Sequence, residues 1–356
     1  MIVSEDKNIN TSGLIIDARS ITQLIYINSV FGKLFSNKDI FLIWKGSKDD
    51  LELANKLLIV PKFFYILDID STDKKLSFNF KNVRKIRALC KRITLTTTPN
   101  TLCTCFSSGL YFDIIKNALH IKDESVIQFD DGSINSFVRK RKFRLLRFAT
   151  NLMHGFFHLP SDYIMFSDKR YNKIFTSINP KNIIDLEYKS VIDISPLVAS
   201  SYKKLSDKFV SIKMSGSALF MSAPTIEAGR MTISEYHKLI LVVYSRLKEL
   251  DVNKIYLSKH PSEKNNSDSL YRKLGLEFTY ANYPSELIMI NKNISIVVNP
   301  INTTMHMAEP LGLLKNITDV ISYVPAKSPY KNIRISSISK VLAKNNINHH
   351  VIDFDE

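Results

Sequence analysis

Two adjacent carboxylates, Asp130 and Asp131, come directly after the apolar run VIQF and directly before Gly132. Like charges placed side by side repel each other, so such a pair costs stability and needs a reason. Gly132 allows a tight turn that leaves a side chain standing free. A carboxylate in that position has the chemistry of a general base, and we choose Asp131 because it is next to the glycine. A solvated Asp-Gly turn is one alternative, and half of a metal site is another, weakened because no further acidic cluster follows closely.

A second polar cluster, Ser258 to Pro261, follows the apolar run KIYL. Lys259 and His260 offer hydrogen-bond donors to a phosphate, and Pro261 fixes the turn that aims the imidazole. A surface histidine in a turn is the alternative interpretation.

Two later segments carry groups that suit a nucleotide. The segment YPSE contains Ser285 and Glu286, and Glu286 can accept hydrogen bonds from a ribose or an amino group. Thr303 and Thr304 precede a predicted helix, whose N-terminus favours a phosphate. The alternatives are a solvated turn residue for Glu286 and simple N-capping for the threonines.

The elements that must position these residues alternate between short β-branched runs and helical stretches, a pattern typical of parallel sheets built from βαβ units. Helices are predicted over residues 108–119 and, after the N-cap Thr232, over 233–250. The predicted strands are GLIIDA, KDIFLIW, KFFYIL, KRITLTTT, SVIQFDD, DYIMFS, SVIDIS, SALFMSAP, KIYLSKHP, NISIVVNP and, as the last strand, ITDVISYV. In both halves the polar motifs follow strands, and ligands of open α/β sheets bind at the carboxyl ends of strands.

The domain boundary is predicted in residues 201–217, which lack a firm apolar pattern and resemble a linker. A chain of 356 residues fits two α/β domains of ordinary size. The prediction is therefore two Rossmann-like domains, 1–210 and 211–356.

The charge balance indicates an anionic partner. The chain has 49 Lys and Arg residues against 34 Asp and Glu residues, a net charge of +15. Such a surface attracts nucleic acid, anionic lipid, sugar nucleotides or acidic glycans. Six basic residues alternate with apolar ones over 139–148, which predicts peripheral contact with an anionic inner membrane or an acidic glycolipid, with a solvated helix face as the alternative.

The use of cysteine favours a reducing compartment, and the hydropathy of the chain favours a location in the cytoplasm. The three cysteines lack the spacing of a zinc site and are predicted to be buried apolar residues. The N-terminus lacks the features of a signal peptide, and no apolar run is long enough to span a membrane. A cytoplasmic protein is expected.

Taken together and in this order, the motifs resemble those of the bacterial sialyltransferases and polysialyltransferases, which share an acidic-acidic-Gly motif, a His-Pro motif and a Ser/Thr pair. The segments IDARSITQ and YPSE extend the resemblance over most of the chain, and it is similar above all to glycosyltransferase family 52. The resemblance implies a GT-B fold, with two Rossmann-like domains facing across a cleft. It implies that the N-terminal domain binds the acceptor and the C-terminal domain binds CMP.

The resemblance also implies roles for individual residues. Asp131 matches the general base, and His260 matches the residue that contacts the donor phosphate. Glu286 matches a residue that binds the cytidine moiety, and Thr303 with Thr304 matches the phosphate-binding pair. The chain departs from the family at one place: the lysine more often stands two residues before the histidine, where this chain has Ser258.

The implied activity is an inverting, metal-independent transfer of sialic acid from CMP-sialic acid to a hydroxyl group of a cell-surface glycan, in lipooligosaccharide or capsule. A single donor phosphate has less need of a bridging cation than a diphosphate. The family also suggests a homodimer. Alternatives are transfer of another CMP-activated nonulosonic acid or Kdo, and polysialic acid synthesis. A UDP-sugar epimerase and a nucleic-acid-binding protein are further rivals, although no nucleic acid is expected because no recognition motif accompanies the charge.

Overall fold

The chain forms two compact units, Met1–Val198 (unit 1) and Ala199–Glu356 (unit 2), each of which is described by itself. The computed structural model describes residues 12–18, 20–34, 39–46, 48–57, 63–67, 80–105, 110–129, 145, 148–149, 152, 170–171, 173–177, 190–209, 217–260, 263–279, 284–290, 294–301, 304–326 and 331–354. The predicted division at residue 210, and the acceptor-binding and donor-binding roles of the two domains, stay predictions.

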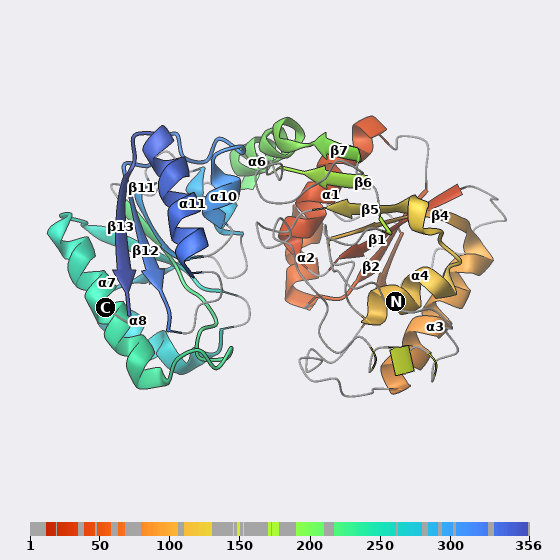
Figure 1. Cartoon of the computed structure of the whole chain (residues 1–356), viewed down its shortest axis with the longest axis horizontal. Coiled ribbons are helices and arrows are strands. Elements are labelled where there is room, and N and C mark those ends of the chain that lie inside the picture. Colours follow the sequence, from red (N-terminus) through yellow and green to blue (C-terminus); the bar gives the residue numbers. More distant parts are fainter. Residues whose placement is uncertain are drawn as a thin grey trace. The chain divides into compact units, whose positions relative to one another are not determined.

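Unit 1 is built on a seven-stranded sheet of order β3-β2-β1-β4-β5-β6-β7, in which the described pairings are parallel. Its strands are β1 (Ser12–Ala18), β2 (Asp39–Trp44), β3 (Phe63–Ile66), β4 (Thr98–Thr104), β5 (Val126–Phe129), β6 (Lys173–Thr176) and β7 (Ser190–Asp193). Its helices include α1 (Ile21–Leu34), α2 (Lys48–Lys56), α3 (Phe80–Thr96) and α4 (Leu110–Ala118). Figure 1 shows α1 and α2 on one side of this sheet and α3 and α4 on the other.

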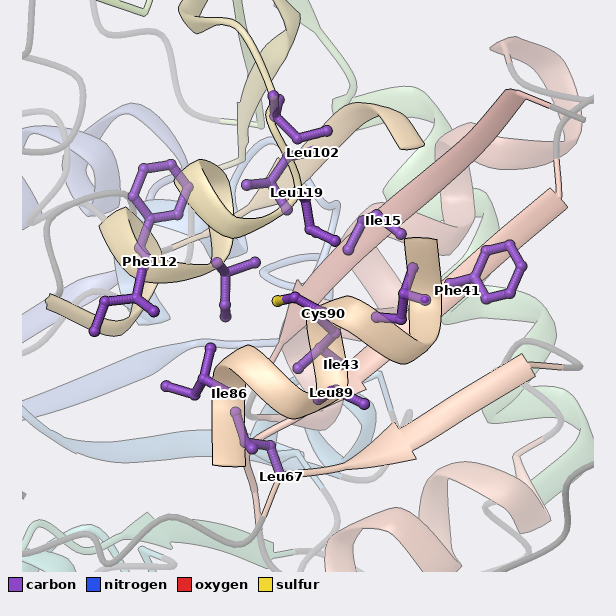
Figure 2. Packing of buried hydrophobic residues seen from close by; sticks show 14 of the residues in the cluster. Ile15, Phe41, Ile43, Leu67, Ile86, Leu89, Cys90, Leu102, Phe112 and Leu119 are labelled. Atoms are coloured by element: carbon purple, nitrogen blue, oxygen red, sulfur yellow. The ribbon is translucent and has the colours of Figure 1, made fainter. Parts of the chain in front are cut away.

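The core between the sheet of unit 1 and α3 explains why the predicted strand KRITLTTT is wrong. Val83, Ile86, Cys90 and Ile93 are buried at helical spacing, and this stripe continues into the segment that was predicted to be extended. Figure 2 shows Ile86, Leu89 and Cys90 of α3 in the same core cluster as Ile15 of β1 and Ile43 of β2. The β-branched residues at the end of α3 therefore reflect a buried helix face, and strand β4 begins only at Thr98.

Unit 2 is built on a six-stranded sheet of order β10-β9-β8-β11-β12-β13, again with parallel pairings. Its strands are β8 (Ser217–Met221), β9 (Lys254–Ser258), β10 (Glu277–Phe278), β11 (Ile294–Pro300), β12 (Asp319–Val324) and β13 (Asn348–Asp353). Its helices include α7 (Ile233–Glu249), α8 (Asp268–Lys273), α9 (Ser285–Met289), α10 (Thr304–Ala308) and α11 (Lys331–Lys344). Figure 1 shows α7 and α11 on opposite faces of this sheet.

Helix α7 confirms the helix predicted after Thr232. The Thr232 side chain accepts from the Glu235 backbone N–H, and the Glu235 side chain accepts from the Thr232 backbone N–H, which is a complete capping box. The buried stripe of the helix includes Tyr236, Ile240 and Leu247 and packs on the sheet. A strong start signal and a regular apolar period agree here.

Further segments differ from the prediction. The expected linker 201–217 is wrong in its first part, because α6 (Ser195–Phe209) buries Val198, Tyr202 and Leu205 at helical spacing. Lysines on the other positions of this helix hide that period in the sequence. The last strand is β13 and not β12, and β6 was not predicted. The predicted strand DYIMFS lies outside the described residues.

The predicted α/β class, with a parallel sheet in each half, is confirmed. The three cysteines are buried and not in disulfides, as expected. Among the described residues, no helix has the length and hydropathy needed to cross a membrane.

Candidate active site

The carboxyl edge of the sheet of unit 2 brings several of the predicted residues together. Strand order reverses between β8 and β11, and such switch points are where open α/β sheets bind ligands. Lys259 and His260 follow β9, which pairs with β8. Thr304 is the first residue of α10, the helix after β11, and α9 with Ser285 and Glu286 contacts β8.

The turn that carries His260 is tied to the end of β8. The His260 backbone N–H donates to Ser222 Oγ over 2.9 Å, and the Ser222 backbone N–H donates to Ser258 O over 3.0 Å. The backbone N–H of Glu263 donates to His260 O over 2.9 Å. Both peptide hydrogen-bonding groups of His260 are therefore engaged, and the position of the residue is fixed relative to two strands.

Glu263 is a buried acid that contacts this turn. Its carboxylate accepts hydrogen bonds from the Ser222 hydroxyl and, over 3.0 Å, from Tyr271 Oη. Burial raises the pKa of Glu263 to about 7, although Ser222, Tyr271 and the charge of Lys259 act in the opposite direction. A carboxyl group that ionises near neutral pH within this cluster was not predicted from the sequence.

The imidazole of His260 reaches solvent, but the surrounding protein removes part of its hydration. This desolvation lowers the pKa of His260 below 6.5, and the negative charge of Glu227 acts against it. The neutral imidazole is therefore the main form at neutral pH in the free protein. A bound phosphate would favour the charged form.

The ammonium group of Lys259 is bound by two side chains of unit 2. Its Nζ lies 2.6 Å from Asp268 Oδ1 and 2.8 Å from Asn265 Oδ1. Its ammonium therefore already has one carboxylate and one amide as partners. A role of Lys259 at the donor phosphate stays a prediction.

Glu286 is almost fully buried at the first turn of α9, which contradicts its interpretation as a solvated turn residue. Burial raises its pKa. Ser285, the first residue of α9, is half-buried, and Thr304 is buried at the start of α10. Pro261 and Thr303 lie outside the described residues.

In unit 1 the predicted base, Asp131, and its neighbour Asp130 lie outside the described residues, two and one positions after the end of β5. The structure shows another polar group at this sheet's own switch point, between β1 and β4. The buried carboxylate of Asp17 is paired with Lys45 at 2.6 Å and 2.7 Å from its two oxygens, and Thr104 Oγ1 lies 3.4 Å away.

The sequence reasoning missed several members of these clusters, among them Asp17, Ser222 and Glu263. Each stands inside or directly after an apolar strand or within a few residues of a predicted site residue. A charged residue in a continuously apolar strand, such as Asp17 in GLIIDA, was the available signal.

No protein-family model matches the chain, and no curated protein matches it in sequence. Solved structures do share its fold. A UDP-GlcNAc 2-epimerase from Methanocaldococcus jannaschii, in complex with UDP-GlcNAc and UDP, is 17% identical, with a TM-score of 0.57 over 96% of this chain and 88% of its own. An α/β-galactoside α-2,3-sialyltransferase from the luminous marine bacterium Photobacterium phosphoreum is 12% identical, with a TM-score of 0.51 over 96% of this chain and 99% of its own. A UDP-glucosyltransferase from Polygonum tinctorium is 10% identical, with a TM-score of 0.51 over 97% and 86%.

These similarities extend over nearly the whole chain, and they confirm the predicted GT-B fold. At such low identity they concern the fold alone. The same fold is used by sugar transferases and by epimerases, so the reaction must be argued from the site.

Proposed function

We propose that this protein is an inverting glycosyltransferase that moves sialic acid from CMP-sialic acid to a hydroxyl group of a cell-surface glycan. The observation that carries the proposal is that His260 and Thr304 follow β9 and β11, on the two sides of the switch point of one parallel sheet, while α9, which carries Glu286, contacts β8. These residues come from segments far apart in the sequence, and their motifs occur in the order found in bacterial sialyltransferases.

The chemistry required of these residues follows from the donor. Negative charge grows on the CMP phosphate as the bond to the sugar breaks, so hydrogen-bond donors must be aimed at that phosphate. The imidazole of His260 and the hydroxyl of Thr304 are suited to this task. Glu286 would accept hydrogen bonds from the cytidine, and its burial would exclude water that competes for them.

Asp131 is proposed to take the proton of the acceptor hydroxyl as the new bond forms. No metal ion is required in this scheme, because one phosphate is neutralised by the histidine and the helix terminus. We therefore expect full activity in excess EDTA.

The first prediction tests the base and the donor together. Asp131→Ala should lower kcat with CMP-sialic acid and a terminal galactoside or sialoside by about 10²–10⁴-fold, because general-base catalysis has that magnitude. Asp130→Ala is the matched control, since it removes an adjacent carboxylate, and it should change kcat far less. The products are identified by mass spectrometry, which also separates single from repeated addition.

A donor panel separates the rival activities. CMP-sialic acid, other CMP-activated nonulosonic acids, CMP-Kdo and UDP-GlcNAc are each supplied to the wild-type protein. Transfer from another CMP-sugar alone would change the sugar in the proposal, and epimerisation of UDP-GlcNAc without turnover of any CMP-sugar would overturn it.

A further inference from the structure

We propose that Glu263 is a positioning residue for His260, which it holds in place through Ser222 and through the backbone of the turn. The inference rests on the proposed role of His260 at the donor phosphate. Glu263 itself does not need to touch the substrate.

Two separate contacts connect Glu263 to the His260 turn. The Glu263 backbone N–H donates to His260 O over 2.9 Å, which closes the turn. Its carboxylate accepts from the Ser222 hydroxyl, and Ser222 Oγ in turn accepts from the His260 N–H over 2.9 Å. Glu263 therefore contacts the C=O of His260 directly. It contacts the N–H of His260 through one intervening side chain, that of Ser222.

The directions of these hydrogen bonds favour an ionised carboxylate. Ser222 uses its lone pair for the His260 N–H and its single proton for Glu263. On the other side, Tyr271 Oη donates to Glu263 Oε1, and the hydroxyls of Tyr271 and Tyr236 lie 3.0 Å apart. An ionised carboxylate only accepts, so it is suited to the two hydroxyl donors, Ser222 and Tyr271, that contact Glu263.

Protonation of Glu263 changes this pattern. The carboxylic acid brings a donor of its own into a site where the hydroxyls of Ser222 and Tyr271 already point at its oxygens. One of the two hydroxyls must then turn away or accept a hydrogen bond. If the Ser222 hydroxyl turns, its hydrogen bond with the His260 N–H changes as well. The protonation state of Glu263 is in this way linked to the position of the imidazole.

The groups around Glu263 set the pH at which this change occurs. Tyr271 comes from α8, Tyr236 from α7 and Tyr323 from β12, while Lys259 follows β9 and Glu227 follows β8. Burial raises the pKa of Glu263 to about 7, Glu227 raises it further, and Lys259 lowers it. The carboxyl group therefore changes charge in the range where enzymes are usually assayed.

The experiment compares wild type with Glu263→Gln and Tyr271→Phe, using CMP-sialic acid as the donor. In the wild type, kcat should rise with pH through an inflection near 7 as Glu263 ionises. In Glu263→Gln that inflection should disappear and kcat should fall by about 10–100-fold, because small displacements of a reacting group have effects of that size. The KM for the donor should change less than kcat, because the contact between His260 and the phosphate becomes stronger as negative charge grows in the transition state.

Tyr271→Phe is the second variant, and it keeps both the carboxylate and Ser222. Loss of the Tyr271 hydrogen bond removes a group that lowers the pKa of Glu263, so the inflection should move to higher pH and not vanish. A merely structural role for Glu263 would lower activity at all pH values equally and would leave the inflection in place. That result, in either variant, would overturn the inference.

A measurement without turnover separates this inference from the proposed function. Ring signals of His260 in histidine-labelled protein, assigned with His260→Gln, should show a second inflection near pH 7 in the wild type and none in Glu263→Gln. If that inflection is present but no CMP-sugar is turned over, the proposed function fails and the link between Glu263 and His260 stands. If CMP-sialic acid is turned over and the His260 signals are the same in both proteins, the link is refuted.

Discussion

Asp17 and Glu263 show two ways in which this protein accommodates a buried acid. Asp17 is paired with Lys45, which contacts both carboxylate oxygens. Glu263 accepts from the hydroxyls of Ser222 and Tyr271, and burial dominates its titration. Burial raises the pKa of Glu263 to about 7, so this carboxyl group gains or loses its proton near neutral pH.

The raised pKa of Glu263 makes a prediction about stability. Between pH 4.5 and 7 the native state keeps the proton of Glu263 and the unfolded state loses it, so this group favours folding at low pH and the benefit is lost as pH rises through about 7. The free energy of unfolding of the wild type, minus that of Glu263→Gln, should fall over this range by at most about 1.4 kcal/mol per pH unit. Urea titrations at a series of pH values measure this difference, and a flat or rising difference would contradict the prediction.

At the level of secondary structure, an element can be predicted from the sequence where its capping residues, its apolar period and the propensities of its residues agree. Helix α7 has a cap and a clear apolar period, and both are present in the structure. Helix α3 ends in β-branched residues, which by themselves favour a strand, but its buried stripe packs on the sheet of unit 1. Propensity is the weaker influence wherever a whole face of a helix is buried.

The cap of α7 gives a prediction at this level. Thr232→Ala removes the side-chain acceptor for the Glu235 N–H and should lower the free energy of unfolding by about 1 kcal/mol. Thr232→Ser keeps the hydroxyl and should be close to the wild type. Chemical denaturation of the three proteins measures the effect, and equal losses in both variants would show that the methyl group and not the cap is responsible.

For the molecule as a whole, the fold narrows the candidate reactions toward those of sugar transferases and epimerases, but it does not determine the donor. Transferases and epimerases share this architecture. The net charge of +15 fits a partner with negative charge but not a particular one. The proposal of CMP-sialic acid as the donor therefore rests on the site residues and on the order of their motifs.

The basic segment 139–148 gives the prediction that belongs to the whole molecule. Replacing its six lysines and arginines with glutamine should weaken binding to vesicles that contain anionic lipid, because each basic residue near such a surface contributes about 1 kcal/mol. Activity on a small soluble acceptor should be kept. Co-sedimentation with anionic and with neutral vesicles measures the difference, and unchanged binding to the anionic vesicles would remove the membrane hypothesis.

The sequence alone was sufficient to predict the α/β class and most of the strands, because the apolar period and the turn residues are local properties of the chain. It also pointed to the His260 turn, because a polar cluster follows an apolar strand there. It did not reveal that Ser222 and Glu263 hold that turn, or that Asp17 meets Lys45, because these pairs join different strands and turns. Such contacts, and the pKa of Glu263 that depends on them, exist only once the sheet has brought distant segments together and excluded water from between them.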